Sequence, residues 1–228
     1  MQALRALRLP WSAWSKMVLV WAFLSSTVAI CAWIEVSRDF APAPFLRLLD
    51  WQPDRWPTQP WRAWTAGLVH WSVAHLGLNI LACAVLIAWG HAAALGRPQT
   101  LSWFLAWPLT HALLSLVPSL AHYGGLSGVL HAGVSIGAWT LIRQGVGPRR
   151  WVGAIVFIGL LLKLALELPD WNPWLTFESG LPMSAPQLNQ PLQGAPGYWV
   201  ASVAHLSGAV SGLVCSWLIE VVQCLRRR

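Results

Sequence analysis

Charged residues are scarce in this chain, and acidic residues are the scarcest of them. Of 228 residues only 10% are charged, with eight Asp and Glu against fifteen Lys and Arg. An ordinary soluble domain carries about 25% charged residues, so this composition excludes that class. Cysteine is also rare, and its spacing fits neither a metal knuckle nor a disulfide framework. We interpret the four cysteines as small apolar packing residues: Cys31, Cys83, Cys215 and Cys224.

Apolar residues make up 56% of the chain, and 18 residues are tryptophan. Crossing ~30 Å of hydrocarbon takes about 20 mostly apolar residues in a helix. The first apolar run lacks a small-residue cleavage site before Glu35, so we do not interpret it as a signal peptide. The sequence therefore predicts an all-α membrane protein built as a bundle of six transmembrane helices. The six runs are Met17–Ile34, Ala66–Trp89, Leu101–Leu120, Gly125–Ile142, Trp151–Leu168 and Tyr198–Val222.

The basic residues are distributed unevenly between the predicted loops. With both termini in the cytoplasm, ten of the fifteen fall on the inner side and four in the outer loops, while Lys163 lies within the fifth run. This is the positive-inside pattern, so we attribute the net charge of +7 to topology rather than to nucleic-acid binding. The predicted organisation is a cytoplasmic segment over 1–16, one membrane domain over 17–223 and a basic cytoplasmic tail over 224–228. Two long outer loops, 37–65 and 169–197, indicate that the protein acts on the outer side of the membrane.

Polar residues inside three runs form a pattern that membrane helices rarely carry without a function. His75 and Asn79 are i,i+4 and share one helix face. At 1.5 Å per residue, His75 is expected about 14 Å below Ala66, and His205 about 10 Å below its own helix start. Ser127 falls near the outer end of the fourth run. The three runs therefore place polar side chains at a similar depth.

Small residues predict that two of these helices approach closely. Ala204, Gly208 and Gly212 recur every fourth residue in the sixth run, and the fourth run has Gly128, Ala132, Gly133 and Gly137. Such small-residue ridges let helix backbones approach in lipid. Ser127 and His205 would then come within reach, with His131 one turn below the serine on the same face.

A serine with a histidine beside it predicts nucleophilic catalysis. A neutral imidazole such as His205 suits the removal of the Ser127 proton. No carboxylate is expected at this depth, with Glu167 the nearest, so a Ser–His dyad is the economical hypothesis. His75, Asn79 and the Ser127 backbone N–H are the candidate oxyanion donors, and Gly125 and Gly128 permit a tight backbone there. No metal or cofactor is required by this chemistry.

Each of these signals also has a structural explanation. His75 with Asn79 could form an interhelical hydrogen-bond pair, and His205 could be a satisfied core histidine. Lys163 and Glu167 are i,i+4 and could simply neutralise each other. We interpret His91, His111 and His122 as loop or packing residues. The functional hypothesis depends on the joint pattern across three helices.

Three blocks resemble the rhomboid family of intramembrane serine proteases. "WRAWTAGLVHWSVAHLGLN" (61–79) resembles the family's Trp-Arg loop motif and His-x-x-x-Asn helix. "GGLSGVLHAG" (124–133) resembles its Gly-x-Ser-Gly segment, and "AHLSGAVSG" (204–212) its Ala-His-x-x-Gly helix. The resemblance implies a six-helix rhomboid-like bundle. Its residues would be Ser127 as nucleophile, His205 as base, His75 and Asn79 as oxyanion donors, Trp61 and Arg62 as a structural pair of the first loop, and Gly125, Gly128 and His131 as supporting residues.

The residues within and between these blocks are similar to those of the rhombosortase branch of the family. "GLSGVLH", "KLALE" (163–167) and "GAPGYWVASVAHLSG" carry this likeness. His131 stands where many rhomboids have a tyrosine that stacks on the catalytic histidine. The branch implies a bacterial inner-membrane protein with its active site facing the periplasm. Its substrates would be secreted proteins with a C-terminal Gly-Gly motif, one apolar helix and a basic tail, and the loop at 169–197 would act as a cap.

Other functions remain as alternatives. One is a general rhomboid protease that cleaves other single-span membrane proteins, and another is a rhomboid-like pseudoprotease that binds transmembrane helices without cleaving them. A metal-dependent enzyme using His70, His75 and His205 is a further rival, ranked low because an i,i+5 spacing would put His70 and His75 on diverging helix faces. A transporter ranks lower still, since the polar cluster is expected near one side of the membrane. The sequence assigns no role to His70, Lys163 or Glu167.

Overall fold

The computed structural model describes residues 23–30, 43–70, 73–117, 120–167 and 197–226. Within these ranges the chain is mostly helical, with one isolated β-bridge between Trp51 and Tyr123. Residues 23–30 are helical as well. The longer helices are α2 (Ala43–Leu49), α4 (Val73–Ala92), α5 (Arg97–Leu113), α6 (Ser127–Gln144), α7 (Pro148–Glu167) and α9 (Gly197–Leu225). The short ones are η2 (Pro53–Arg55), α3 (Arg62–Thr65), η3 (Ala66–Leu68) and η4 (Leu114–Leu116).

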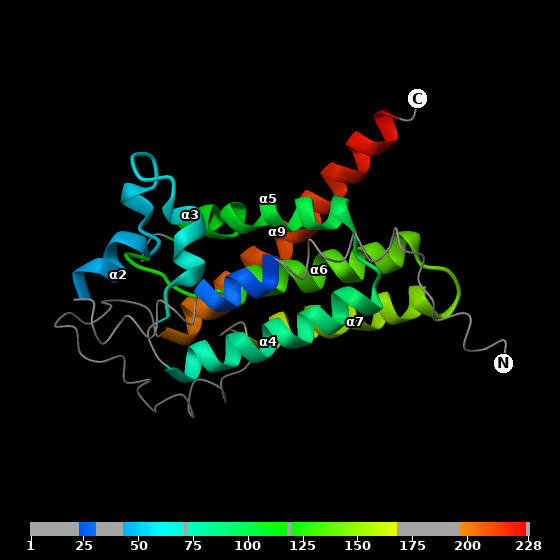
Figure 1. Cartoon of the computed structure of the whole chain (residues 1–228), viewed down its shortest axis with the longest axis horizontal. Helices are drawn as coiled ribbons and strands as arrows, with labels where there is room; N and C mark the ends of the chain where they lie inside the picture. Colours follow the sequence, from blue (N-terminus) through cyan, green and yellow to red (C-terminus); the bar gives the residue numbers. More distant parts are fainter. Residues whose placement is uncertain (1–22, 31–42, 71–72, 118–119, 168–196, 227–228) are drawn as a thin grey trace.

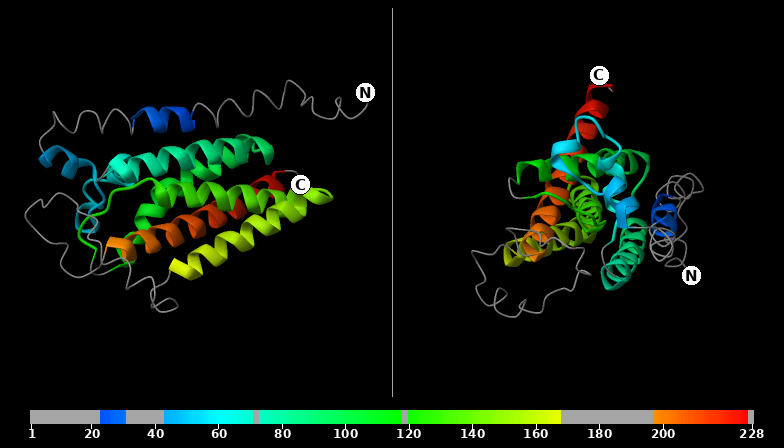
Figure 2. Two further views of the ribbon diagram at one scale, coloured as in Figure 1. Left: turned by 90° about the horizontal axis from the view of Figure 1, so that it is seen from below. Right: turned by 90° about the vertical axis from the view of Figure 1, so that its left-hand side faces the viewer.

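Helix α6 is the centre of the bundle. It packs against α4, α5, α7 and α9, and α9 also packs against α5 and α7. Figure 1 shows α9 crossing the bundle obliquely, and the two views of Figure 2 show the long helices lying alongside one another. Consecutive long helices run in alternating directions. The starts of α4, α6 and α9 and the end of α7 therefore lie at one end of the bundle, which we call the site end.

Helices α6 and α9 approach until their backbones touch. A Cβ on Gly128 would lie 2.6 Å from the carbonyl oxygen of Ala204, and one on Gly208 would overlap the carbonyl oxygen of Gly128. One turn further along α9, a Cβ on Gly212 would overlap the Ser135 hydroxyl. The predicted close approach is confirmed through Gly128 and Ala132 on α6, which lie against α9. Gly133 and Gly137 do not belong to this contact, because they pack against Leu86 and Trp89 of α4.

Helix α4 begins later than the sequence predicted. The second apolar run was expected to be helical from Ala66, but residues 66–68 form η3, Val69 is extended, and α4 starts at Val73. Tertiary contacts hold this segment in place, because the Ala66 carbonyl accepts the Gly125 N–H at 3.0 Å and Gly67 packs against the Trp107 indole. The predicted depth of about 14 Å below Ala66 is therefore wrong. His75 lies in the first turn of α4.

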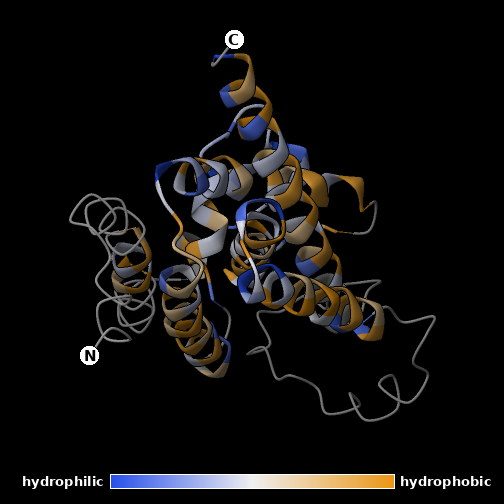
Figure 3. Cartoon of the chain, turned by 90° about the vertical axis from the view of Figure 1, so that its right-hand side faces the viewer, coloured by the Kyte–Doolittle hydropathy of each residue, from blue (hydrophilic) through white to orange (hydrophobic). Residues whose placement is uncertain are grey.

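Among the described residues, two helices are long and apolar enough to cross a membrane, α4 over Ala74–Ala92 and α9 over Ser202–Leu225. Helix α5 has 17 residues, and α7 carries Arg149 and Arg150 at one end and Lys163 and Glu167 at the other. Much of the apolar surface of the helices faces outward, as Figure 3 shows by colour. Leu78 on α4 and Ile155 on α7 are both 67% exposed. Exposed apolar faces of this extent fit a lipid environment better than water.

Candidate active site

Ser127 is the first residue of α6, at the site end of the bundle. The turn before it requires glycine, since Gly125 has φ +154° and a Cβ there would lie 2.9 Å from Cε1 of His75. The first intrahelical hydrogen bond runs from the Leu130 N–H to the Leu126 carbonyl. The backbone N–H groups of Ser127, Gly128 and Val129 therefore have no acceptor within the helix, and a helix N-terminus of this kind favours a developing negative charge.

His131 and His205 form a stacked pair beside the serine. Their ring centroids are 4.1 Å apart with an interplanar angle of 18°. Nδ1 of His131 is 2.7 Å from the carbonyl oxygen of Ser127, so this ring lies on the serine's own helical turn. His205 comes from α9 and is brought there by the contact between Gly128 and Gly208. An imidazole at position 131 thus stacks on His205, as the tyrosine at this position does in many rhomboids.

A carboxylate contacts His205, against our expectation from the sequence. Oε2 of Glu167 lies 2.8 Å from Nδ1 of His205, and Oε1 of Glu167 lies 2.5 Å from Nζ of Lys163. The predicted Lys163–Glu167 ion pair is present, and Glu167 in addition contacts His205. Glu167 ends α7 and His205 lies in the third turn of α9, so no local spacing pointed to this contact. The earlier expectation that no carboxylate reaches this depth is wrong.

His75 faces the serine loop from the first turn of α4, and Asn79 lies one turn further along the same helix. The His75 ring lies against Gly125, two residues before Ser127. Asn79 is buried, and its Nδ2 is 2.9 Å from Nε2 of His70. Because His70 precedes α4 rather than belonging to it, its ring meets that of His75 edge-on at 5.1 Å. The expectation that these two rings diverge on one helix is therefore wrong.

Proximity of histidines does not make a metal centre in the part of the chain described. No group of three or more His, Cys, Asp or Glu side chains there has an arrangement that could hold a metal ion. The Nε2 atom of His70 is engaged by the Asn79 amide. The groups available for chemistry at this site are therefore side-chain hydroxyl, imidazole and amide groups rather than a set of metal ligands.

Tyr123 is a site residue that the sequence analysis did not single out. It is buried, and its hydroxyl donates to the Gly125 carbonyl at 3.3 Å, beside the Ser127 side chain and the Gly128 backbone. Burial raises the pKa of Tyr123 to about 12, although its interactions with Ser127 and Gly128 lower it. The phenol therefore stays protonated at neutral pH, and its hydroxyl lies next to the N-terminal N–H groups of α6.

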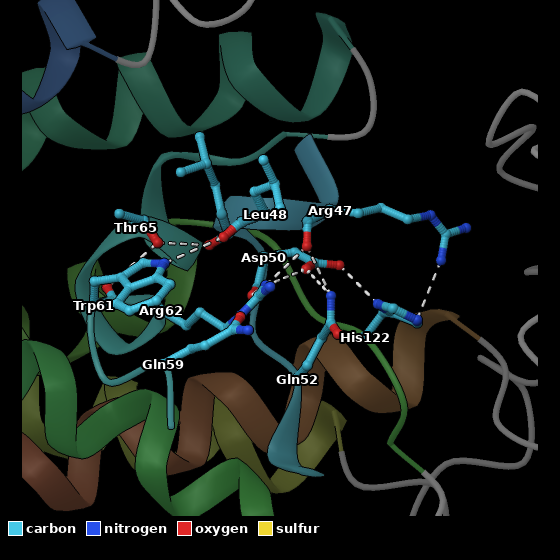
Figure 4. A network of polar contacts seen from close by, with 10 residues as sticks. Arg47, Leu48, Asp50, Gln52, Gln59, Trp61, Arg62, Thr65 and His122 are labelled. Carbon is cyan, nitrogen blue, oxygen red and sulfur yellow. Dashed lines mark hydrogen bonds and ion pairs between the residues drawn. The ribbon is translucent and has the colours of Figure 1, made fainter. Parts of the chain in front are cut away.

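The first loop is organised around Arg62, as Figure 4 shows. The buried guanidinium donates from Nη1 to the Asp50 carboxylate at 3.0 Å and to the Asp50 backbone carbonyl at 2.7 Å, and from Nε to Gln59 at 2.6 Å. Trp61 is half exposed, and its Nε1 lies 3.4 Å from the Leu48 carbonyl. Losing one partner of a buried ion pair costs about 3–5 kcal/mol, so Arg62 and Asp50 fix the shape of this loop.

The same network is joined to the serine loop. His122 Nδ1 lies 2.8 Å from the second oxygen of Asp50. Next to it, Trp51 and Tyr123 exchange backbone hydrogen bonds of 2.7 and 3.0 Å. The sequence predicts a loop or packing residue at His122, but this side chain connects the Arg62–Asp50 pair to the segment that precedes Ser127. The predicted cap at 169–197 lies, except for its last residue, outside the described residues.

Comparison with known proteins supports the family resemblance that the sequence motifs indicate. A search of curated proteins found no match to this chain. A family model described as Rhomboid domain matches residues 57–221, well over half of the chain, and the match includes Ser127, His205, His75 and Asn79. The chain therefore belongs to the rhomboid family of membrane proteins, whose members are generally intramembrane serine proteases that act on membrane-protein substrates within the bilayer.

Proposed function

We propose that this protein is an intramembrane serine endopeptidase in which Ser127 is the nucleophile and His205 its general base. The observation that carries the proposal is the stacking of His205 on His131. Nδ1 of His131 is in turn hydrogen-bonded to the backbone carbonyl of Ser127. Nδ1 of His205 is engaged by Glu167. The other ring nitrogen, Nε2, is then the atom that would accept the serine proton.

The proposed reaction follows from these groups. Nε2 of His205 takes the hydroxyl proton while Oγ of Ser127 attacks the scissile carbonyl. The oxyanion is held by the N–H groups at the start of α6 and by the side chains of His75 and Asn79, where one donor is worth roughly 100- to 1,000-fold in rate. His205 then gives its proton to the leaving amine, and water hydrolyses the acyl-enzyme on Ser127. For the oxyanion to enter, the Tyr123 hydroxyl would move away from the Gly128 N–H.

The substrate we propose is the C-terminal sorting signal of secreted proteins, made of a Gly-Gly motif, one apolar helix and a basic tail. The likeness of three segments to the rhombosortase branch supports it. Glycines lower helix stability by roughly 1 kcal/mol each, so such a motif unwinds readily at the end of a transmembrane helix. We place the protein in a bacterial inner membrane as a six-helix bundle with cytoplasmic termini. A general rhomboid protease acting on other single-span proteins is the alternative.

The experiment is cleavage of a fluorescent single-span substrate that carries a Gly-Gly tail. We expect Ser127→Ala and His205→Ala each to abolish cleavage while the thermal unfolding midpoint in detergent stays that of the wild type. Mass spectrometry of the product defines the cut and tests the Gly-Gly substrate against a glycine-free tail. Cleavage by Ser127→Ala at the wild-type rate would refute the mechanism.

Covalent labelling separates the proposal from the pseudoprotease alternative. A fluorophosphonate probe is expected to label the wild type at Ser127 and to leave Ser127→Ala unlabelled. Labelling that also persists in Ser127→Ala would mean that another residue reacts. A wild type that resists the probe and cleaves no substrate would favour a helix-binding protein.

A further inference from the structure

The surroundings of His205 are more than a dyad requires. The ionisable groups around its ring are Lys163 and Glu167 from α7, His131 from α6 and His75 from α4. Its side chain is 14% exposed and that of Glu167 is 27% exposed, so the imidazole is largely screened from solvent and the carboxylate only partly. The ring is held on one face by His131 and at one edge by Glu167.

The contact at this edge decides which nitrogen carries the proton. A carboxylate only accepts hydrogen bonds, so the 2.8 Å contact with Glu167 requires a hydrogen on Nδ1 of His205. Lys163 only donates, and its Nζ is 3.4 Å from the same Nδ1. If Lys163 bonded to Nδ1, the proton would move to Nε2 and the base facing Ser127 would be lost. The shorter contact and the engagement of Lys163 by the other oxygen of Glu167 favour the productive tautomer.

We infer that Glu167 is a positioning residue that fixes His205 with its proton on Nδ1, so that Ser127, His205 and Glu167 act as a triad. The inference rests on the proposed protease function. The Ser127 proton passes to Nε2 of His205, the resulting imidazolium is stabilised through its Nδ1–H by the Glu167 carboxylate, and the proton on Nε2 later leaves with the amine. Glu167 stays ionised throughout. Lys163, one turn earlier on α7, holds the second carboxylate oxygen and so orients the first.

Glu167→Gln is the decisive variant, because an amide can donate to Nδ1 and so stabilise the wrong tautomer. In a serine protease triad, removing the carboxylate's charge in place costs about 10⁴-fold in kcat. Because Glu167 is partly exposed, we expect a smaller loss here, on the order of 100-fold in the rate at which a fluorophosphonate labels Ser127 and in the cleavage rate. Glu167→Asp, which keeps the carboxylate, should recover part of the loss. Glu220→Gln is the matched control, since Glu220 pairs with Arg143 near the other end of α9.

A purely structural role for Glu167 predicts different results. Without the carboxylate the imidazolium loses its partner, so the acid limb of the pH–rate profile should move to lower pH in Glu167→Gln, by about one pH unit. Lys163→Met keeps the Glu167–His205 contact and removes a cation 3.4 Å from Nδ1, so it should lose less activity and should not move the limb to lower pH. If the Lys163–Glu167 pair only held α7 in place, both variants would lose similar activity and neither would move the limb.

Two outcomes would overturn the inference. One is that Glu167→Gln is labelled at the wild-type rate and keeps the acid limb of its pH–rate profile unchanged. The other is that Glu167→Gln and Lys163→Met lose similar activity and neither moves that limb. Imidazole ¹⁵N shifts of His205 provide a readout that needs no substrate, because a shift to the Nε2–H tautomer in Glu167→Gln is expected and an unchanged tautomer contradicts it. Ser127→Ala separates the two proposals. If it is inactive while Glu167→Gln is unaffected, the triad fails and the protease stands, whereas an active Ser127→Ala refutes the protease itself.

Discussion

Single residues at the site end are held by contacts from separate parts of the chain. The His205 ring is confined by a stack on one face and a carboxylate at one edge. The Asn79 amide is oriented by His70, which accepts one of its two hydrogens and leaves the second for the oxyanion of the proposed reaction. Groups fixed in this way need little reorganisation when charge develops in the transition state.

The contact between Asn79 and His70 makes a prediction about their relative importance. His75→Ala and Asn79→Ala should each lower kcat on the order of 100-fold, because each removes an oxyanion donor. His70→Ala should cost only about tenfold, because it removes the orientation of Asn79 and not the donor. The measurement is kcat on the fluorescent Gly-Gly substrate, with the unfolding midpoint as the check on folding. A loss in His70→Ala equal to that in Asn79→Ala would instead mean that His70 acts on the substrate directly.

At the scale of elements, the site depends on how closely α6 and α9 approach. Their contact at Gly128 and Gly208 brings Ser127 and His205, which are 78 residues apart in the sequence, to the same end of the bundle. The small-residue ridges predicted this contact because a four-residue period is visible in a single helix. The start of α4 was predicted wrongly, because Ala66 and Gly67 are held by Gly125 and Trp107, which are remote in the sequence.

Adding one methyl group at the helix contact tests this packing. Gly208→Ala should lower the free energy of unfolding by about 1–3 kcal/mol or more, because the new Cβ overlaps a backbone carbonyl that cannot move freely. Gly159→Ala is the matched control. Its Cβ would meet nothing within 4 Å, so it should be neutral or stabilising by up to about 1 kcal/mol. Thermal unfolding in detergent measures both, and equal midpoints for Gly208→Ala and the wild type would contradict the predicted contact.

At the scale of the whole molecule, the first loop and the turn between α6 and α7 lie at opposite ends of the bundle. The first loop adjoins the start of α6, and Gly145–Gly147 follow its end. Arg149 and Arg150 lie beside that turn, as expected for a cytoplasmic connection. We propose that the protein inserts with its site end outward, because this asymmetry matches the positive-inside pattern.

Cysteine accessibility tests the orientation. In a background where the native cysteines are replaced, Thr58→Cys in the first loop should react with a membrane-impermeant maleimide in cells whose outer membrane is permeable to the reagent. Val146→Cys should react only after the inner membrane is disrupted, although Val146 is 84% exposed in the structure. Gel shifts with a maleimide-polymer conjugate measure both. Labelling of Val146→Cys before disruption, with Thr58→Cys protected, would reverse the topology.

The sequence by itself determined the helical membrane class, the family motifs and the ridge that joins α6 to α9, because hydrophobic runs and four-residue spacings are local properties of the chain. Only the tertiary structure decided which side chains from different helices come into contact. Glu167 reaches His205 and Tyr123 reaches Ser127 because α7, α9 and the serine loop converge at one end. His122 joins the first loop to the serine through Asp50. These contacts depend on the relative placement of helices and loops, which no periodicity within one segment encodes.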